Sequence, residues 1–220
     1  MFKLSGLIPA VFTPFDKTGA INFSQIQPYA DKLIAEGAYG VFVCGSTGEC
    51  TSMTVAERKS VLEAWTKAVA GRILIIAHVG GTCQADCIEL ARHAAGLGGG
   101  RCRRHRRPVL PQTRLGRRTG GLLQTHRRCM RTAALLRLPH SLPMIDFLKN
   151  GSKEIPNLNG IKFTSNNFME MIECIRFDGG RFDILNGFDE MLLCGMAVGA
   201  RGGVGSTYNL SLIHISEPTR

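Results

Sequence analysis

The chain has 220 residues, 44% of them hydrophobic and 20% charged, so it is long enough to bury one sizeable core and short for two full domains. No apolar run approaches the roughly 18 residues that a bilayer span needs, and Pro9 and Pro14 interrupt the N-terminal region before a signal-peptide core could form. The formal net charge is +10, but twelve arginines lie in residues 99–143 without a lysine or an acid, and the remainder holds 15 basic and 17 acidic residues. We therefore expect a cytoplasmic protein with no membrane partner and, for a chain of this size, reduced cysteines rather than a disulfide framework.

The first hundred residues alternate short apolar runs with amphipathic stretches. This alternation predicts strands over residues 7–13, 40–43 and 73–78, and helices over 22–36, 54–70 and 86–95. Asn22 is expected to cap the first helix, which Gly37 ends, while Thr54 and Glu57 form a capping box for the second helix. The unit repeats about every thirty residues, as parallel βαβ packing requires.

The alternation stops at residue 98 and resumes near Met144. Beyond that point we expect strands over residues 158–163, 182–186 and 202–206, and helices over 167–175 and 189–198. Six predicted strands, with room for two more in the middle, indicate the α/β fold class of a TIM (β/α)8 barrel, which typically has about 250 residues. The barrel is expected to be incomplete, because twelve arginines without acids cannot form the buried strands four and five.

Four short motifs follow the ends of predicted strands, where such a barrel carries its catalytic groups. They are GSTGE at residues 45–49, GIKFT at 160–164, NGFDE at 186–190 and GVGST at 203–207. Together they resemble the family of pyruvate-dependent class I aldolases that contains the dihydrodipicolinate synthases and the N-acetylneuraminate lyases. The GSTGE turn and the lysine of GIKFT resemble features shared by that whole family. The GFDE run at residues 187–190 and the GSTYN run at 205–209 are similar to its N-acetylneuraminate lyase branch.

The resemblance implies a lyase that cleaves N-acetylneuraminate to N-acetylmannosamine and pyruvate through a lysine Schiff base, without a cofactor or a metal. Lys162 is then the nucleophile, because burial at the mouth of a barrel favours a neutral amine. The pattern alone leaves open a surface lysine whose stem snorkels along apolar neighbours. Members of the family are typically cytoplasmic homotetramers, and the partners implied are N-acetylneuraminate and pyruvate, with no nucleic acid and no membrane.

The same resemblance implies a substrate pocket built from the other strand ends. Ser46 and Thr47 are expected to hold the substrate carboxylate with hydroxyl and N–H donors, although GSTG is also common turn chemistry. The residues expected to line the pocket and bond the sugar hydroxyls are Thr164, Gly187, Asp189, Glu190 and Ser206. The two carboxylates could equally cap the helix that follows them.

Residues 99–143 depart from the family pattern. The family ends strand five in a Tyr-x-x-Pro motif whose tyrosine moves a proton, but the three tyrosines of this chain are Tyr29, Tyr39 and Tyr208. Back-translating residues 135–142 and reading one base later yields Phe-Tyr-Asp-Tyr-His-Ile-Pro, which contains that motif. We hypothesise that 99–143 is a frameshifted segment. Resequencing the gene tests this, since an intact in-frame sequence for these arginines contradicts it.

The predicted organisation is one barrel domain over residues 1–209 followed by a non-native tail. Residues 210–220 resemble a translated sequencing adapter, so the C-terminal helices of the family are expected to be missing. Without strands four and five the barrel is expected to be open and to expose strand edges. Without the tyrosine, the chain as given is expected to be inactive.

Two other functions remain open from the sequence. Within the fold, the alternative is a related pyruvate aldolase or a dihydrodipicolinate synthase type enzyme. A more distant alternative is an arginine-rich nucleic-acid-binding protein, which is disfavoured because the run lacks lysine and interleaved aromatic residues.

Cys83 and Cys87, with His93 nearby, do not supply the four ligands of a structural zinc site. His78 either faces the barrel mouth or is a structural histidine.

Overall fold

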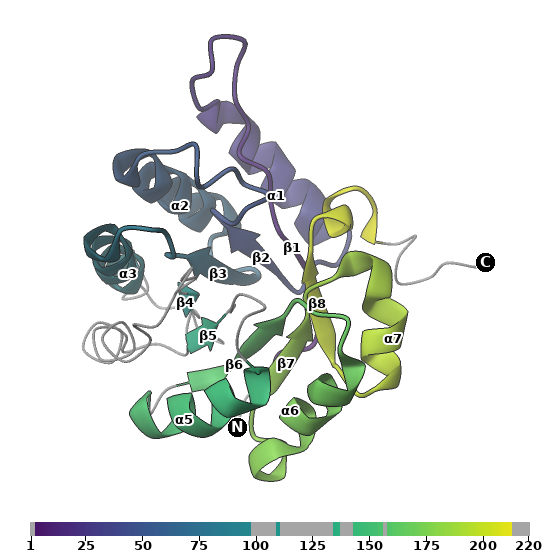
Figure 1. Ribbon diagram of the computed structural model, residues 1–220. Helices are drawn as coiled ribbons and strands as arrows, with labels where there is room; N and C mark the ends of the chain where they lie inside the picture. The colour runs from purple at the N-terminus through teal and green to yellow at the C-terminus, as the bar shows by residue number, and fades with distance from the viewer. Residues whose placement is uncertain (1–2, 98–108, 111–133, 137–142, 156–157, 213–220) are drawn as a thin grey trace, which may run out of the picture.

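The computed structural model describes residues 3–97, 109–110, 134–136, 143–155 and 158–212. Across these ranges eight parallel strands follow the order β1-β8-β7-β6-β5-β4-β3-β2. Their bounds are β1 Gly6–Pro9, β2 Gly40–Val43, β3 Leu74–His78, β4 Val109–Leu110, β5 Ala134–Leu136, β6 Leu158–Phe163, β7 Asp183–Asn186 and β8 Gly202–Gly205. The strands lie at the centre and the helices lie around them, which confirms the predicted fold class (Figure 1).

The sheet closes between β1 and β2. Ala10, just after β1, forms a parallel bridge with Phe42 of β2, and the Val11 N–H donates to the Phe42 carbonyl at 3.1 Å. Nearer the amino ends of the two strands, the Tyr39 N–H donates to the Leu7 carbonyl at 3.0 Å. The sheet therefore closes between β1 and β2, whereas the two residues of β4 and the three residues of β5 leave the barrel incomplete there, as expected.

Strands β4 and β5 lie in the segment for which no strands were expected. They have two and three residues, and a single Cα pair, Val109 with Ala134, joins them. Both fall in arginine-free stretches, one between two prolines and the other between Arg131 and Arg137. Neither stretch contains a charged residue, and the described residues form eight strands where six were expected. The remainder of the arginine-rich segment lies outside the described residues, as does most of the tail.

Helices pack around the outside of the barrel (Figure 1). Their bounds are α1 Ile26–Ala35, α2 Val55–Val69, α3 Gln84–Leu97, α5 Met144–Glu154, α6 Phe168–Gly180 and α7 Leu192–Ala197, with short 3-10 turns η1 Phe23–Gln25, η2 Asp189–Met191 and η3 Thr207–Asn209. The capping box of α2 is confirmed, since Thr54 and Glu57 each accept a hydrogen bond from the other's backbone N–H. Asn22 makes no such cap, because its side chain accepts from the Ser24 hydroxyl at 2.6 Å and a 3-10 turn precedes α1.

Removing the capping hydroxyl is expected to weaken α2. Thr54→Ala leaves the Glu57 N–H without its side-chain acceptor, so the free energy of unfolding should fall by about 1 kcal/mol. Urea denaturation followed by circular dichroism measures the change. Ser60→Ala is the matched control, because the Ser60 hydroxyl is exposed within the same helix and bonds only the Ala56 carbonyl. An equal loss in the control would contradict the capping role.

The alternation of side chains along each strand sorts the core into two layers. The inner layer lies inside the barrel and contains Leu4, Ile8, Ala10, Phe42, Leu74, Ile76, Leu185 and Val204. The outer layer packs the strands against the helices, and Trp65 of α2 is fully buried in it. In β6, Ile161 and Phe163 belong to the outer layer. Lys162, between them, therefore points into the barrel.

The segment after β8 is tied back to the start of the chain. The Asn209 side-chain amide donates to the carbonyls of Ala10 and Ser206, each at 2.7 Å. Its oxygen accepts from the Tyr29 hydroxyl of α1 at 2.6 Å. These bonds hold the loop that follows β8 against β1 and α1, at the carboxyl ends of the strands.

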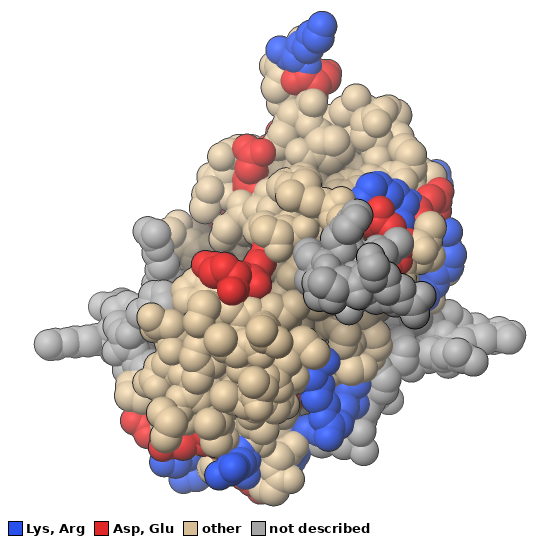
Figure 2. All heavy atoms as spheres, turned by 90° about the vertical axis from the view of Figure 1, so that its right-hand side faces the viewer, with Lys and Arg blue, Asp and Glu red and all other residues tan. Residues whose placement is uncertain are grey.

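The surface around α7 is poor in charge. Figure 2 shows few charged side chains on this side of the molecule, and α7 exposes Leu193 and Met196. Exposed apolar side chains are common on protein surfaces and indicate no function by themselves. Among the residues that the structure describes, no helix is both long enough and apolar enough to cross a bilayer.

Candidate active site

Lys162 lies near the carboxyl end of β6, inside the barrel. Only 7% of its surface is exposed. Its Nζ atom lies over the ring of Phe42 from β2, 5.2 Å from the ring centre. A lysine amine that is shielded from solvent loses part of the hydration that favours its charged form, which makes it available as a nucleophile. The burial of Lys162 argues against a surface lysine with a snorkelling stem.

The end of β7 packs directly against Lys162. The Gly187 N–H donates to the Phe163 carbonyl at 2.8 Å. A Cβ atom on Gly187 would lie 2.9 Å from that carbonyl oxygen, 3.1 Å from Lys162 Cε and closer still to Thr164 Oγ1. Thr164 is buried, and its hydroxyl has no hydrogen-bond partner within the described ranges. Three of the predicted site residues, Lys162, Thr164 and Gly187, are therefore neighbours.

Gly187→Ala is expected to disturb this arrangement. The added methyl has to displace the Lys162 side chain or the Thr164 hydroxyl, which should lower the free energy of unfolding by about 1–3 kcal/mol. Urea denaturation measures this loss. The control is Gly96→Ala in α3, because a Cβ there meets nothing within 4 Å, and we expect no loss of stability. Equal losses in both variants would speak against the steric argument.

The turn after β2 lies beside the loop after β8. The hydroxyls of Thr47 and Ser206 form a hydrogen bond of 2.7 Å, and the Thr13 hydroxyl donates to the Gly48 carbonyl at 2.8 Å. Ser46 and Ser206 are exposed, so their hydroxyls are accessible to a ligand. The predicted carboxylate-binding turn is thus held next to β1 and β8, at the mouth of the barrel.

Two strained residues flank this turn. Cys44 and Glu49 have φ values of +58° and +56°, in the left-handed region that is costly for residues other than glycine. The buried His78 donates from Nδ1 to the Cys44 carbonyl at 2.8 Å. Burial also raises the pKa of the Cys44 thiol to about 12, so it stays protonated near neutral pH. This hydrogen bond gives His78 a structural role, which was one of its two predicted roles.

Asp189 joins the loop after β7 to the loop after β8. Its Oδ2 atom accepts from the Thr207 N–H at 2.7 Å and from the Thr207 hydroxyl at 2.9 Å. Glu190 is exposed at the start of η2. Both carboxylates lie in the first turn of η2, after the N-cap position that Phe188 occupies. Asp189 orders the segment that begins η3.

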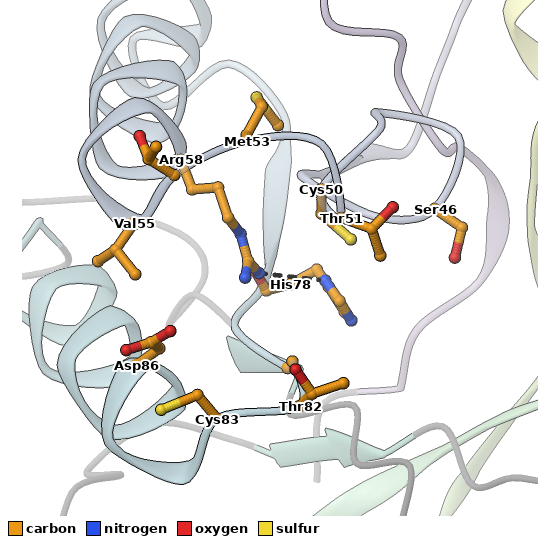
Figure 3. A pocket seen from close by; sticks show the side chains of 13 residues that line it. Ser46, Cys50, Thr51, Met53, Val55, Arg58, His78, Thr82, Cys83 and Asp86 are labelled. Carbon is orange, nitrogen blue, oxygen red and sulfur yellow. Dashed lines mark hydrogen bonds between the residues drawn. The ribbon is translucent and has the colours of Figure 1, made fainter.

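A cavity of about 530 Å³ lies beside the mouth, between the beginnings of α2 and α3 (Figure 3). Its polar lining includes Ser46, Thr51, Thr54, Arg58, Thr82 and Asp86. Arg58 is 6% exposed and donates to the His78 carbonyl at 2.8 Å, so its guanidinium holds the end of β3 against α2. Lys162 does not line this cavity, and only Ser46 belongs to both the cavity and the predicted site.

The three tyrosines occupy different parts of the barrel. Tyr29 is on α1, where burial raises the pKa of its hydroxyl to about 12. Tyr39 packs against Gly6 at the amino end of β1, and burial raises its pKa. The Tyr208 hydroxyl lies near Gly203 on the outer face of β8, and burial, with the Asp189 carboxylate nearby, raises its pKa. Burial is the main cause of the raised pKa of all three hydroxyls.

Cys87 and His93 of α3 make structural contacts. Cys87 donates to the Gly81 carbonyl at 3.7 Å, and His93 Nε2 lies 3.1 Å from the Glu63 carboxylate. Within the described part of the chain, no group of three or more histidine, cysteine or acidic side chains is arranged to hold a metal ion.

Phe42 is the residue at Lys162 that sequence reasoning missed. Its strand, Gly40–Val43, carries no polar side chain, so composition does not reveal which positions face inward. The useful signal is that side chains along a strand point alternately inward and outward. Val41 and Val43 both belong to the outer layer, so Phe42 between them faces the interior. A Cβ on Gly45 would come within 2.8 Å of the Phe42 ring, which explains why a glycine opens the turn.

Comparisons with known proteins agree with this geometry. The sequence profile described as the dihydrodipicolinate synthetase family matches residues 3–102 and 145–215. The chain belongs to this family. The profile leaves out residues 103–144, which nearly coincide with the arginine-rich segment.

The relatives of the chain include proteins named N-acetylneuraminate lyase. That of Danio rerio is 34% identical, over 94% of this chain and 70% of its own, and that of Homo sapiens is 35% identical, over 94% and 67%. Among solved structures, the lyase of Proteus mirabilis is 37% identical with a TM-score of 0.88, covering 98% of this chain and 75% of the other. The lyase of Aliivibrio salmonicida is 35% identical with a TM-score of 0.90, covering 98% and 73%.

Proposed function

We propose that this chain carries the Schiff-base site of an N-acetylneuraminate lyase, an aldolase that cleaves N-acetylneuraminate to N-acetylmannosamine and pyruvate. The observation that carries the proposal is the buried amine of Lys162 at the mouth of a (β/α)8 barrel, beside Thr164 and Gly187. The choice of substrate is supported by relatives and solved structures named N-acetylneuraminate lyase.

The reaction would begin with attack of the Lys162 amine on the C2 ketone of the open-chain sugar. A carbon–nitrogen bond forms, the ketone oxygen leaves as water, and the resulting iminium draws electrons from the neighbouring carbons. Loss of the C4 hydroxyl proton then breaks the C3–C4 bond and releases N-acetylmannosamine. Protonation of the remaining enamine at C3 and hydrolysis release pyruvate and return the free amine.

The neighbouring polar groups would hold the substrate for these steps. The hydroxyls of Ser46 and Thr47 at the mouth would bind the carboxylate, together with N–H groups of the turn, and Thr47 is hydrogen-bonded to Ser206. The residues proposed to line the pocket and bond the sugar hydroxyls are Thr164, Gly187, Asp189, Glu190 and Ser206. The unpartnered, buried hydroxyl of Thr164 beside Lys162 supports its place in this set.

The chain as given would turn over little or no sugar. Residues 99–143, where the family pattern places the proton-carrying tyrosine, contain none, and we attribute its absence to a frameshift over this segment. The proposal further includes a single barrel domain over residues 1–209, a non-native tail over 210–220, a cytoplasmic location, a homotetrameric intact enzyme and no nucleic-acid partner.

Trapping with borohydride tests the shared chemistry. We expect incubation with pyruvate and sodium borohydride to leave a reduced pyruvate adduct on Lys162, identified by peptide mass spectrometry. Absence of the adduct from a folded chain would contradict a Schiff-base enzyme of any kind. The description of the matching family makes a dihydrodipicolinate synthase type reaction the second candidate. Cleavage of N-acetylneuraminate and condensation of pyruvate with aspartate semialdehyde, compared in a repaired chain, separate the two.

A further inference from the structure

The inner layer of the barrel places an aromatic ring against the reacting nitrogen. β2 and β6 are four strands apart in the closed eight-stranded order, so Phe42 and Lys162 meet across the interior. Phe42 is 3% exposed, and the Lys162 Nζ atom lies over its ring at 5.2 Å from the centre. The pair is therefore held together in a space from which most water is excluded.

The position of the ring is fixed by its neighbours. On one side the His78 ring lies 5.8 Å away, centre to centre, with a tilt of 52°. On another side the backbone of Gly45 approaches so closely that an added Cβ would fall within 2.8 Å of the ring. Because His78 is itself bonded to the Cys44 carbonyl, the aromatic pair is connected to the turn after β2.

A ring held in this way favours a positive charge above its face. The face of an aromatic ring carries negative electrostatic potential and attracts a cation within about 6 Å of its centre, more strongly where water is absent. Condensation of the Lys162 amine with a ketone moves one amine hydrogen, together with a proton from solvent, to the departing water. The nitrogen keeps one hydrogen and a positive charge at the same place above the ring.

We propose that Phe42 is a positioning residue whose ring face holds and stabilises the cationic nitrogen of Lys162, most importantly the iminium formed with pyruvate. The inference rests on the proposed function and adds to it a residue from β2, a strand that otherwise contributes only its following turn. The contact acts alongside the other interactions of Lys162, which are also made inside the barrel.

Stepwise fluorination of the ring tests this role. Phe42 is replaced by phenylalanines with one, two or three ring fluorines, which withdraw charge from the ring face while leaving the apolar side chain in place. Titration with pyruvate and borohydride trapping gives the apparent dissociation constant of the iminium. We expect the constant to rise with each fluorine, reaching about tenfold for the trifluorinated ring.

The matched control is the same series at Phe163. This residue is fully buried next to Lys162 in sequence but lies in the outer layer, so the constant should stay unchanged. The inference is overturned, and the proposed function is unaffected, if the dissociation constant does not change with fluorination of Phe42. The same holds if the constant changes equally at Phe42 and Phe163. No adduct in the unsubstituted, folded chain overturns the proposed function and this inference together.

Discussion

Lys162→Met is expected to reduce pyruvate trapping by the folded chain to background. The substitution removes the only atom that forms the carbon–nitrogen bond in the proposed reaction, so no partial activity should remain. Sodium borohydride reduction in the presence of pyruvate, followed by mass spectrometry of the intact chain, measures the loss. The methionine is apolar and similar in length, so it suits the buried position, and urea denaturation should show no large loss of stability.

Two further variants make this result specific. Lys149 lies on the exposed face of α5, so the Lys149→Met variant should trap as much pyruvate as the unsubstituted chain does. Lys162→Arg keeps a positive charge near the Phe42 ring but cannot form the iminium, so it should fold and fail to label. Labelling of Lys162→Met at the level of the unsubstituted chain would place the adduct on another lysine and refute the assigned nucleophile.

Replacing residues 99–143 and 210–220 with the corresponding segments of the Proteus mirabilis lyase is expected to restore cleavage of N-acetylneuraminate. We expect the graft to supply the tyrosine that the family pattern places after strand five, and general acid–base catalysis by a positioned side chain typically contributes about 10²–10⁴-fold. Release of pyruvate, followed by its reduction with lactate dehydrogenase and NADH, measures the gain over the chain as given.

A second form of the graft, with phenylalanine in place of that tyrosine, separates chemistry from folding. It should be as stable as the first graft and trap pyruvate, yet turn over sugar about 10²–10⁴-fold more slowly. Equal turnover by both grafts would show that the tyrosine is not the missing group. Turnover by the unmodified chain at the level of the first graft would refute the frameshift hypothesis.

Most of the secondary structure was predictable because its signals are local. The strand predicted over residues 158–163 matches β6, and the helix predicted over 54–70 matches α2, whose capping box lies within four residues of sequence. The first helix begins later than predicted because Asn22 bonds Ser24 instead of the backbone, a choice between two local partners. Strands β4 and β5 were not predicted because short apolar runs among arginines gain their pairing from neighbouring strands.

For the site, the motifs could be predicted from the sequence, but most contacts between them could not. The motif around Lys162 and that around Gly187 are adjacent in the structure because β6 and β7 are neighbours in the sheet, which the order of motifs already indicates. The Thr47–Ser206 hydrogen bond and the Phe42–Lys162 contact depend on closure of the barrel, which no local pattern encodes. Thr47, Ser206 and Lys162 were predicted one by one, whereas Phe42, which contacts Lys162 across the interior, was missed.

The bonds of Asn209 also determine when the mouth can assemble. They join residues 199 positions apart at Ala10 and 180 positions apart at Tyr29, and the Thr47–Ser206 bond spans 159 positions. During synthesis, β1 leaves the ribosome with one edge that cannot be paired until β8 has been made. Contacts so distant in sequence form slowly and late in folding. The nascent chain therefore depends on its last segment to protect its first strand from pairing with other chains.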